Sequence, residues 1–172
     1  EISACLVGSE MCIRDRLEEQ ANEGIRQYIK AKNPYEFQDM VAALLRAMGY
    51  YTPFVAPKGR DGGVDVIAYI DALGAKTPRI KVQVKHMPET SIPAKDIRSL
   101  LGILRDGDIA LFVTSGTYSP QARTEALTSK TYIKLIDGEE FIEMWQEYYS
   151  KMNDEDKNMM PLKHIAFVGS NE

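Results

Sequence analysis

Residues 62–67 read Gly-Gly-Val-Asp-Val-Ile, and residues 81–86 read Lys-Val-Gln-Val-Lys-His. The second stretch alternates polar and apolar side chains, which is typical of a β-strand with two unlike faces. Gln83 and Lys85 share one face of this strand, and the two valines share the other. Because polar groups are costly to bury without partners, the face that carries Gln83 and Lys85 must look onto water or onto a site.

The two stretches are predicted to pair as a hairpin of strands over residues 64–70 and 79–86. Counted from the middle of the connecting turn, Asp65 and Lys85 are equally far away, so they are expected to lie opposite each other. Asp65, Gln83 and Lys85 would then cluster on one surface of the sheet.

A carboxylate, an amide oxygen and an ammonium together suit the hydrolysis of a phosphodiester. Mg²⁺ prefers oxygen ligands in an octahedron and keeps several waters. Asp65, the side-chain oxygen of Gln83 and the backbone carbonyl of Val84 could supply three protein oxygens. Lys85 could then orient or deprotonate a metal-bound water, or offset charge on a pentavalent phosphate. The cluster therefore predicts a metal-dependent phosphodiesterase site.

Outward from the hairpin, the chain reads as alternating helices and strands. Asn33 and Pro34 begin a helix, with Asn33 as N-cap and Glu36 three residues after the cap. Pro53 indicates an edge strand or a bulge. We expect helices over residues 17–31, 34–48, 93–104, from 120 onward and 138–150, and further strands over residues 50–56, 109–115 and 131–136, with a closing strand or a tail over 161–168.

The order of these elements predicts an α/β sandwich. The early strands can form an antiparallel meander, whereas the later strand–helix–strand crossover implies parallel pairing and a sheet covered on both faces. A chain of 172 residues is long enough for one domain with a substantial core.

Taken as an average, the net charge of −4 argues against a nucleic-acid partner, but the charge is unevenly distributed. Residues 17–136 carry a net charge of +3, and residues 137–156 carry −7. We interpret the acidic segment as a solvated helix face and linker that lies away from DNA. The body of the domain is compatible with a polyanionic partner.

The first 16 residues, EISACLVGSEMCIRDR, show no clear periodicity and do not have the pattern of a signal peptide. They resemble translated read-through of a sequencing adaptor, so we expect a non-native segment that replaces the natural N-terminus. Cys5 and Cys12 lie within it and cannot staple a fold of this size. No apolar run approaches the ~18 residues of a membrane span, so we expect a soluble, cytoplasmic protein.

Several short motifs, in this order along the chain, resemble the catalytic domain of Mrr-type restriction endonucleases, within the PD-(D/E)xK nuclease superfamily. They are Pro34-Tyr35-Glu36-Phe37, Ala47-Met48-Gly49-Tyr50, Gly62-Gly63-Val64-Asp65, Gln83-Val84-Lys85, Phe112-Val113-Thr114-Ser115, then Ser119 and Ala122, and Leu135-Ile136-Asp137-Gly138. The resemblance covers roughly residues 33–148. It implies a restriction-endonuclease-like three-layer sandwich, with a central mixed β-sheet flanked by helices.

The resemblance also implies roles for individual residues. Asp65 would be the principal metal ligand, Lys85 the catalytic lysine and Glu36 the helix acid that points into the site. Gln83 stands where other members have Glu or Asp, and a neutral amide holds Mg²⁺ less tightly than a carboxylate does. The expected cofactor is Mg²⁺, with Mn²⁺ as a substitute. The chain also departs from the superfamily pattern because no proline precedes Asp65.

The implied partner is double-stranded DNA, cut by a homodimer that supplies two active sites. The expected DNA contacts are a basic rim and the hydroxyls at the end of a strand: Lys58, Arg60, Lys95 and Arg98, and Thr114, Ser115 and Thr117. Each has an ordinary alternative, as a solvated surface charge or a loop-forming hydroxyl. The family commonly carries a separate N-terminal domain that recognises modified DNA, which this chain is expected to lack.

We thus divide the chain into a non-native segment (1–16), a helical lead-in (17–32), a nuclease catalytic domain (33–150) and an acidic linker with a C-terminal tail (151–172). The expected function is restriction of foreign or modified DNA. Two alternatives stay open: a nuclease fold that binds DNA without cutting it, and a related nuclease that acts on branched DNA or RNA.

Overall fold

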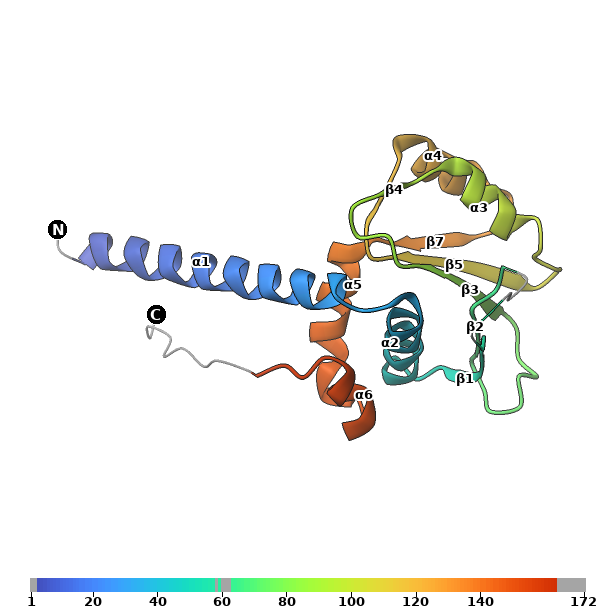
Figure 1. Ribbon diagram of the computed structural model, residues 1–172, viewed down its shortest axis with the longest axis horizontal. Helices are drawn as coiled ribbons and strands as arrows, with labels where there is room; N and C mark the ends of the chain where they lie inside the picture. Colours follow the sequence, from blue (N-terminus) through green and yellow to red (C-terminus); the bar gives the residue numbers. More distant parts are fainter. Residues whose placement is uncertain (1–2, 58, 60–62, 164–172) are drawn as a thin grey trace.

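The computed structural model describes residues 3–57, 59 and 63–163, with side chains from residue 16 onward. Its centre is a five-stranded sheet in the order β1-β2-β3-β5-β7 (Figure 1). The strands are β1 (Tyr51–Val55), β2 (Val66–Tyr69), β3 (Arg79–Lys85), β5 (Asp108–Thr114) and β7 (Ile133–Ile136). β1, β2 and β3 pair antiparallel, and β3, β5 and β7 pair parallel, so the predicted mixed sheet is confirmed.

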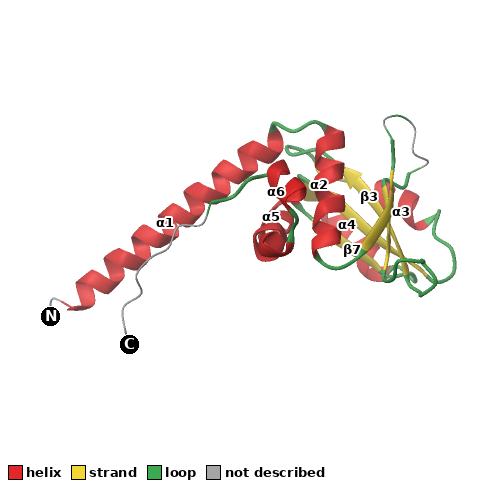
Figure 2. Cartoon of the chain, turned by 90° about the horizontal axis from the view of Figure 1, so that it is seen from below, coloured by secondary structure: helices red, strands yellow, loops and turns green. Residues whose placement is uncertain are grey.

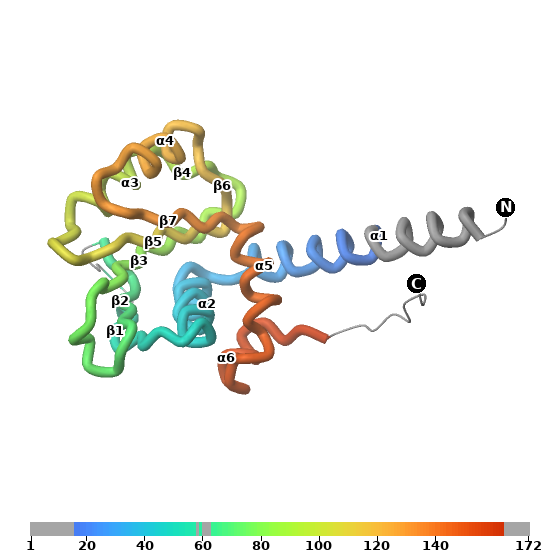
Figure 3. The backbone as a smooth tube through the Cα atoms, turned by 180° about the vertical axis from the view of Figure 1, so that it is seen from behind, coloured from blue at the N-terminus to red at the C-terminus, as the bar shows by residue number. Residues whose placement is uncertain are grey.

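Helices cover both faces of this sheet, as the sandwich prediction requires. On one face lie α2 (Pro34–Ala47) and α5 (Gly138–Tyr148), joined by α1 (Ser3–Lys30) and α6 (Asp154–Met159); on the other lie α3 (Ala94–Leu101) and α4 (Pro120–Thr128). Figure 2 shows the sheet in section, and Figure 3 shows α3 and α4 on the side opposite α2, α5 and α6.

β5 is the centre of the core because it is buried on both faces. Leu111 and Val113 pack under α2 and α5, whereas Ala110 and Phe112 pack under α3 and α4. A parallel strand covered on both sides reads as a nearly continuous apolar run, which is why its position was predictable from the sequence.

Side-chain caps mark the starts of α2, α4 and α5. The Asn33 side chain accepts hydrogen bonds from the backbone N–H groups of Tyr35 and Glu36, at 3.0 Å each. Ser119 caps α4 by accepting from the Ala122 N–H, and Asp137 caps α5 by accepting from the Glu140 N–H. Each cap satisfies N–H groups that the helix itself leaves without partners.

The edge prediction for the first strand is also confirmed. β1 lies at one edge of the sheet and contains Pro53, and its register against β2 shifts between Tyr51 and Phe54. Proline cannot donate to a ladder, so an edge strand with a bulge accommodates it.

The structure differs from the sequence interpretation at both ends of the chain. Helix α1 begins at Ser3, whereas we expected a helix from residue 17; no proline interrupts this stretch, so the helix can propagate through it. Toward the other end, residues 154–159 form α6 instead of a linker. Asp156 on α6 is buried and binds the Arg46 guanidinium of α2 through Oδ2, 3.2 Å from Nε. Of the expected closing strand or tail, residues 161–163 have no regular structure and the remainder lies outside the described residues.

A small parallel sheet of β4 (Ser91–Ile92) and β6 (Thr117–Tyr118) was not predicted. Strands of two residues carry too little periodicity to be recognised. This sheet ties the segments that follow β3 and β5 to each other, at the carboxyl ends of these strands.

Candidate active site

The β2–β3 hairpin brings Asp65 beside Gln83 and Val84. Val66 pairs with Val82 and Ala68 with Ile80, and the Asp65 N–H donates to the Val82 carbonyl, so Asp65 lies beside the Val82–Val84 segment of β3. The expected pairing of Asp65 with Lys85 is therefore wrong, because the bonds of Asp65 go to Val82 and Val84 instead.

The turn explains this shift. Asp71 accepts hydrogen bonds from the backbone N–H groups of Leu73, Ala75 and Lys76, and Gly74 adopts a left-handed conformation with φ 63°. Because the geometry of the turn determines the register of a hairpin, these side-chain bonds decide which residues face each other. The bonds, above all that from Lys76, also hold the pKa of the Asp71 carboxyl below its ordinary value.

Asp65 is buried, with 6% of its surface exposed. Its backbone N–H donates to the Val82 carbonyl at 2.8 Å, and its own carbonyl accepts from the Ala56 N–H at 2.7 Å. Its carboxylate accepts from the Val84 N–H, with Oδ2 2.6 Å from the nitrogen. Backbone and side-chain bonds thus hold the carboxylate against the middle of the Gln83-Val84-Lys85 motif.

The backbone carbonyl of Val84 points toward the same edge of β3 as its N–H. The Lys85 carbonyl accepts from the Ser115 N–H at 3.3 Å, so Lys85 turns its backbone toward β5. Successive residues of a strand turn their N–H and C=O groups to opposite neighbours, and the two groups of one residue point the same way. Val84 therefore presents its carbonyl on the side where Asp65 lies.

Gln83 and Lys85 look onto the layer of α3 and α4. In the β3–β5 ladder, Gln83 pairs with Phe112, which packs in the core beneath α3 and α4. The Lys85 ammonium lies 2.7 Å from Asp96 Oδ2 at the start of α3. Gln83 Oε1 is buried, and it has no hydrogen-bond partner within the part of the chain that the structure describes. A buried acceptor without a partner is costly, which marks this oxygen as one that a ligand would satisfy.

On α2, a different side chain from the expected one reaches the Asp65 segment. Glu36 accepts from the Asn33 N–H at 2.8 Å, which completes a capping box. Gln38, which the sequence interpretation missed, is buried and donates to the Ala56 carbonyl at 2.8 Å. Since Ala56 also bonds to Asp65, Gln38 is linked to the site through a single residue.

The three hydroxyl residues at the end of β5 do not act as one group. Thr114 is fully buried, and its hydroxyl donates to the Lys85 carbonyl at 2.9 Å and accepts from the Gly116 N–H at 3.1 Å. The expected phosphate contact of Thr114 is therefore wrong: packing at the end of β5 engages this hydroxyl in the protein itself.

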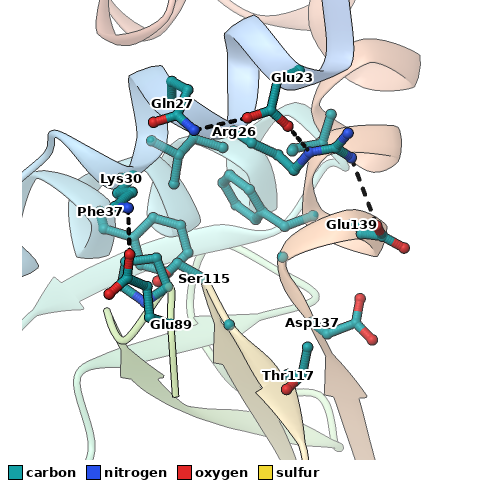
Figure 4. A pocket seen from close by; sticks show the side chains of 16 residues that line it. Glu23, Arg26, Gln27, Lys30, Phe37, Glu89, Ser115, Thr117, Asp137 and Glu139 are labelled. Carbon is teal, nitrogen blue, oxygen red and sulfur yellow. Dashed lines mark hydrogen bonds and ion pairs between the residues drawn. The ribbon is translucent and has the colours of Figure 1, made fainter. Parts of the chain in front are cut away.

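Ser115 and Thr117 instead line a cavity of about 310 Å³ between α1, α5 and the carboxyl ends of the strands (Figure 4). Its rim carries ion pairs, among them Arg26 Nε–Glu23 Oε2 at 2.9 Å. Neither Gln83 nor Lys85 is among the residues that line it. Ser115 and Thr117 thus belong to a different part of the surface from Gln83 and Lys85.

The predicted basic rim is described only in part. Lys58 and Arg60 lie outside the described residues. Lys95 and Arg98 are exposed on α3, the helix that also carries Asp96, and Arg98 pairs with Glu125 of α4 at 2.8 Å. These two cations therefore border the face onto which Gln83 and Lys85 look.

The oxygens around Asp65 fit a magnesium ion better than a softer metal. Among the side chains that the structure describes, in residues 16–57, 59 and 63–163, no group of three or more His, Cys, Asp or Glu could hold a metal ion. One carboxylate, one amide oxygen without a partner and one backbone carbonyl form a set of hard oxygen ligands, and Mg²⁺ completes such a set with water.

The fold and this arrangement define the class of protein as a nuclease domain of the restriction-endonuclease type. A family model described as restriction endonuclease, Mrr_cat, matches residues 29–145. The match spans more than half of the chain, and the chain belongs to this family.

Solved structures with the same fold include two restriction endonucleases. One is the MspJI restriction endonuclease in complex with a 27-mer oligonucleotide, with a TM-score of 0.60 and 20% identity over 82% of this chain and 35% of that chain. The other is the DNA modification-dependent restriction endonuclease AspBHI, with a TM-score of 0.62 and 16% identity over 76% of this chain and 36% of that chain. A third is AF1548, described as a protein of unknown function, with a TM-score of 0.52 and 21% identity over 69% of this chain and 67% of that chain. This chain spans about a third of the length of the first two. A comparison with curated proteins gave no match.

No helix in the described part of the chain is long and apolar enough to cross a membrane.

Proposed function

We propose that this chain is a Mg²⁺-dependent endonuclease domain that hydrolyses phosphodiester bonds of double-stranded DNA. One observation carries the proposal: the Asp65 carboxylate lies against the backbone of Val84, and the preceding residue, Gln83, has a buried side-chain oxygen without a partner in the described chain. Such a site has oxygen ligands for a cation and a lysine on the same strand. Family membership and fold agree with this chemistry.

Asp65, Gln83 and the Val84 carbonyl would hold the ion. When bound, Mg²⁺ would supply Lewis-acid stabilisation of the negative charge that develops on the phosphate. Because Gln83 contributes a neutral amide, we expect weaker binding than at a site with two carboxylates, with half-saturation at a higher Mg²⁺ concentration. Mn²⁺ is the expected substitute.

Lys85 would provide the positive charge of the site. Its ammonium is a donor to the attacking water or to a phosphate oxygen, and it offsets the charge of the pentavalent transition state. Lys95 and Arg98 on α3 would contact the DNA backbone, which positions the duplex without reading its sequence.

The proposed biological role is restriction of foreign or modified DNA. AspBHI is described as dependent on DNA modification, and this chain matches only part of that protein. We propose that target selection belongs to a separate recognition domain and that the catalytic domain described here supplies the cut.

Lys85→Ala should abolish cleavage of supercoiled plasmid while the protein stays folded, because the side chain looks onto the site and not into the core. The measurement is nicking and linearisation at a series of Mg²⁺ and Mn²⁺ concentrations, with circular dichroism to check folding. Lys151→Ala, an exposed lysine beyond α5, is the matched control and should cut like the wild type. Full cleavage by Lys85→Ala would refute the proposed site, and a wild-type chain that shifts DNA without cutting it would be a binding module.

The choice of substrate can be tested with methylated and unmodified copies of one plasmid, alongside a branched duplex and an RNA of equal length. If the catalytic domain itself does not read the modification, the two plasmids are cut at rates within about twofold, since its phosphate contacts carry no sequence information. Preference for the methylated plasmid would place recognition within this domain instead. Faster cutting of branched DNA or RNA would assign the enzyme another role.

A further inference from the structure

An ion pair with α3 determines where the Lys85 ammonium lies. Lys85 Nζ is 2.7 Å from Asp96 Oδ2, and the two side chains are 32% and 15% exposed. A lysine carries its charge on a flexible four-carbon stem, so the backbone of β3 alone does not place it. The Asp96 carboxylate selects one position for this charge among the many that the stem allows.

Asp96 comes from a rigid part of the molecule. It lies in the first turn of α3, where its N–H donates to the Pro93 carbonyl at 3.1 Å. Ile97 and Leu100 on the same helix are fully buried in the core beneath α3 and α4. Because apolar packing already anchors α3, the attachment of the helix does not depend on the Asp96 carboxylate.

A comparison with Lys81, two residues before Gln83 on the same face, supports this view. Lys81 binds the fully buried Asp108 carboxylate at 3.0 Å and the Ile103 carbonyl at 2.9 Å, so its ammonium is committed to holding the structure together. Within the described residues the Lys85 ammonium bonds to one side chain, that of Asp96, and a lysine ammonium has three N–H donors. One donor to Asp96 leaves two for a water molecule and a phosphate oxygen.

We propose that Asp96 is a positioning residue. It holds the Lys85 ammonium where it can act on the substrate, on the face of β3 that carries Gln83. This inference rests on the proposed function, in which Lys85 acts on the scissile phosphate. It adds a member to the site from a helix that none of the recognised motifs includes. The same helix, α3, would then both contact the DNA backbone and determine the position of the Lys85 charge.

The kinetic test compares Asp96→Asn and Asp96→Glu with the wild type. Misplacing a catalytic group by about 1 Å can cost ~100-fold in rate, so we expect Asp96→Asn to lower kcat about 10- to 100-fold with KM changed less than about twofold. Asp96→Glu keeps a carboxylate and should recover part of the loss. The matched control is Glu140→Gln, which removes the carboxylate from the Lys134–Glu140 pair on β7 and α5 and should leave kcat unchanged.

A second readout does not depend on cleavage. Acylation of lysines by an amine reagent, followed by mass spectrometry of the peptide that contains Lys85, reports whether the ammonium is held. We expect labelling of Lys85 to be several-fold faster in Asp96→Asn than in the wild type, and unchanged in Glu140→Gln.

The outcomes separate this inference from the proposed function. If the wild type cuts DNA and Asp96→Asn cuts at the same kcat, or if Lys85 labels equally in both, Asp96 does not position the lysine. If the wild type cuts no DNA with either metal, the proposed function fails and this inference fails with it, whatever the labelling shows. An equal loss of kcat in Asp96→Glu and Asp96→Asn with normal folding would also count against positioning by the carboxylate.

Discussion

At the scale of single residues, two polar side chains of helix α2, Glu36 and Gln38, have different structural roles. Glu36 closes the capping box with Asn33 and is exposed, with its carboxylate also 3.7 Å from the Lys32 ammonium. Gln38 is buried and bonds to Ala56, the neighbour of Asp65 in the sheet. A capping position can be recognised from spacing alone, whereas the burial of Gln38 depends on where β1 and β2 lie.

The two side chains should respond differently to truncation. Gln38→Ala leaves the buried Ala56 carbonyl without this donor, so we expect a loss of about 1–3 kcal/mol in the free energy of unfolding and slower cleavage because Asp65 loses support. Glu36→Ala should cost about 1 kcal/mol as the loss of a cap, with a smaller effect on the cleavage rate. Urea unfolding and plasmid cleavage measure both. A larger loss of cleavage in Glu36→Ala would instead favour a direct role of Glu36 in the site.

At the scale of secondary-structure elements, Asp108 fastens β3 to β5. Its side chain is fully buried and bonds to the Arg79 guanidinium at 3.0 Å and to the Lys81 ammonium at 3.0 Å, and it accepts from the Arg105 N–H at 2.9 Å. Burial alone would raise the pKa of this carboxyl, but the Arg105 N–H and the Lys81 ammonium outweigh burial and hold the pKa below its ordinary value. The anchored strands are the two that begin the parallel part of the sheet.

This pKa predicts acid sensitivity. A carboxyl whose pKa is lowered on folding stabilises the protein above its unfolded pKa, ~3.9, and this contribution disappears as the pH falls through the folded pKa. Asp108→Asn should therefore lower the free energy of unfolding by about 2 kcal/mol near neutral pH. The difference from the wild type should shrink below about pH 4. Urea unfolding at a series of pH values gives the comparison, and a difference that stays constant down to pH 2 would contradict the assignment.

The acidic segment over residues 137–156 is part of the packed structure and is not a solvated linker. Residues 137–156 include α5 and the first part of α6, and Trp145 and Met152 join the core beneath α2. We expected solvated acidic residues here, but Asp156 is buried and pairs with Arg46. The expected position of this segment away from DNA stays a prediction, and composition could not reveal that the segment packs into the core.

At the scale of the whole molecule, the acidic helices and the two cations expected to contact DNA lie on opposite sides of the sheet. The acidic helices α5 and α6 lie on one side, and the cations Lys95 and Arg98 lie on α3 on the other (Figure 3). A net charge of −4 thus does not prevent one face from meeting a polyanion, since exposed charges beyond about 10 Å are largely screened at ordinary ionic strength.

If the α3 face meets DNA, binding should weaken with salt in a way that single cations control. Lys95→Ala and Arg98→Ala should each lower the slope of log affinity against log salt concentration by about 1, as expected for the loss of one phosphate contact. Lys151→Ala, beyond α5, should leave the slope unchanged. Fluorescence anisotropy with a labelled duplex at several salt concentrations measures this, and equal slopes for all four proteins would exclude α3 from the interface.

The sequence by itself determined the order of the main elements, the caps, the edge position of β1 and the face shared by Gln83 and Lys85, because each depends on residues only a few positions apart. Tertiary structure decided the neighbour of Asp65, the burial of Thr114, the link through Gln38 and the pairing of Lys85 with Asp96. Each of these depends on turn geometry or on packing between distant segments. Short-range periodicity contains no information on either, and for that reason the sequence identified the chemical groups of the site but not how the fold arranges them.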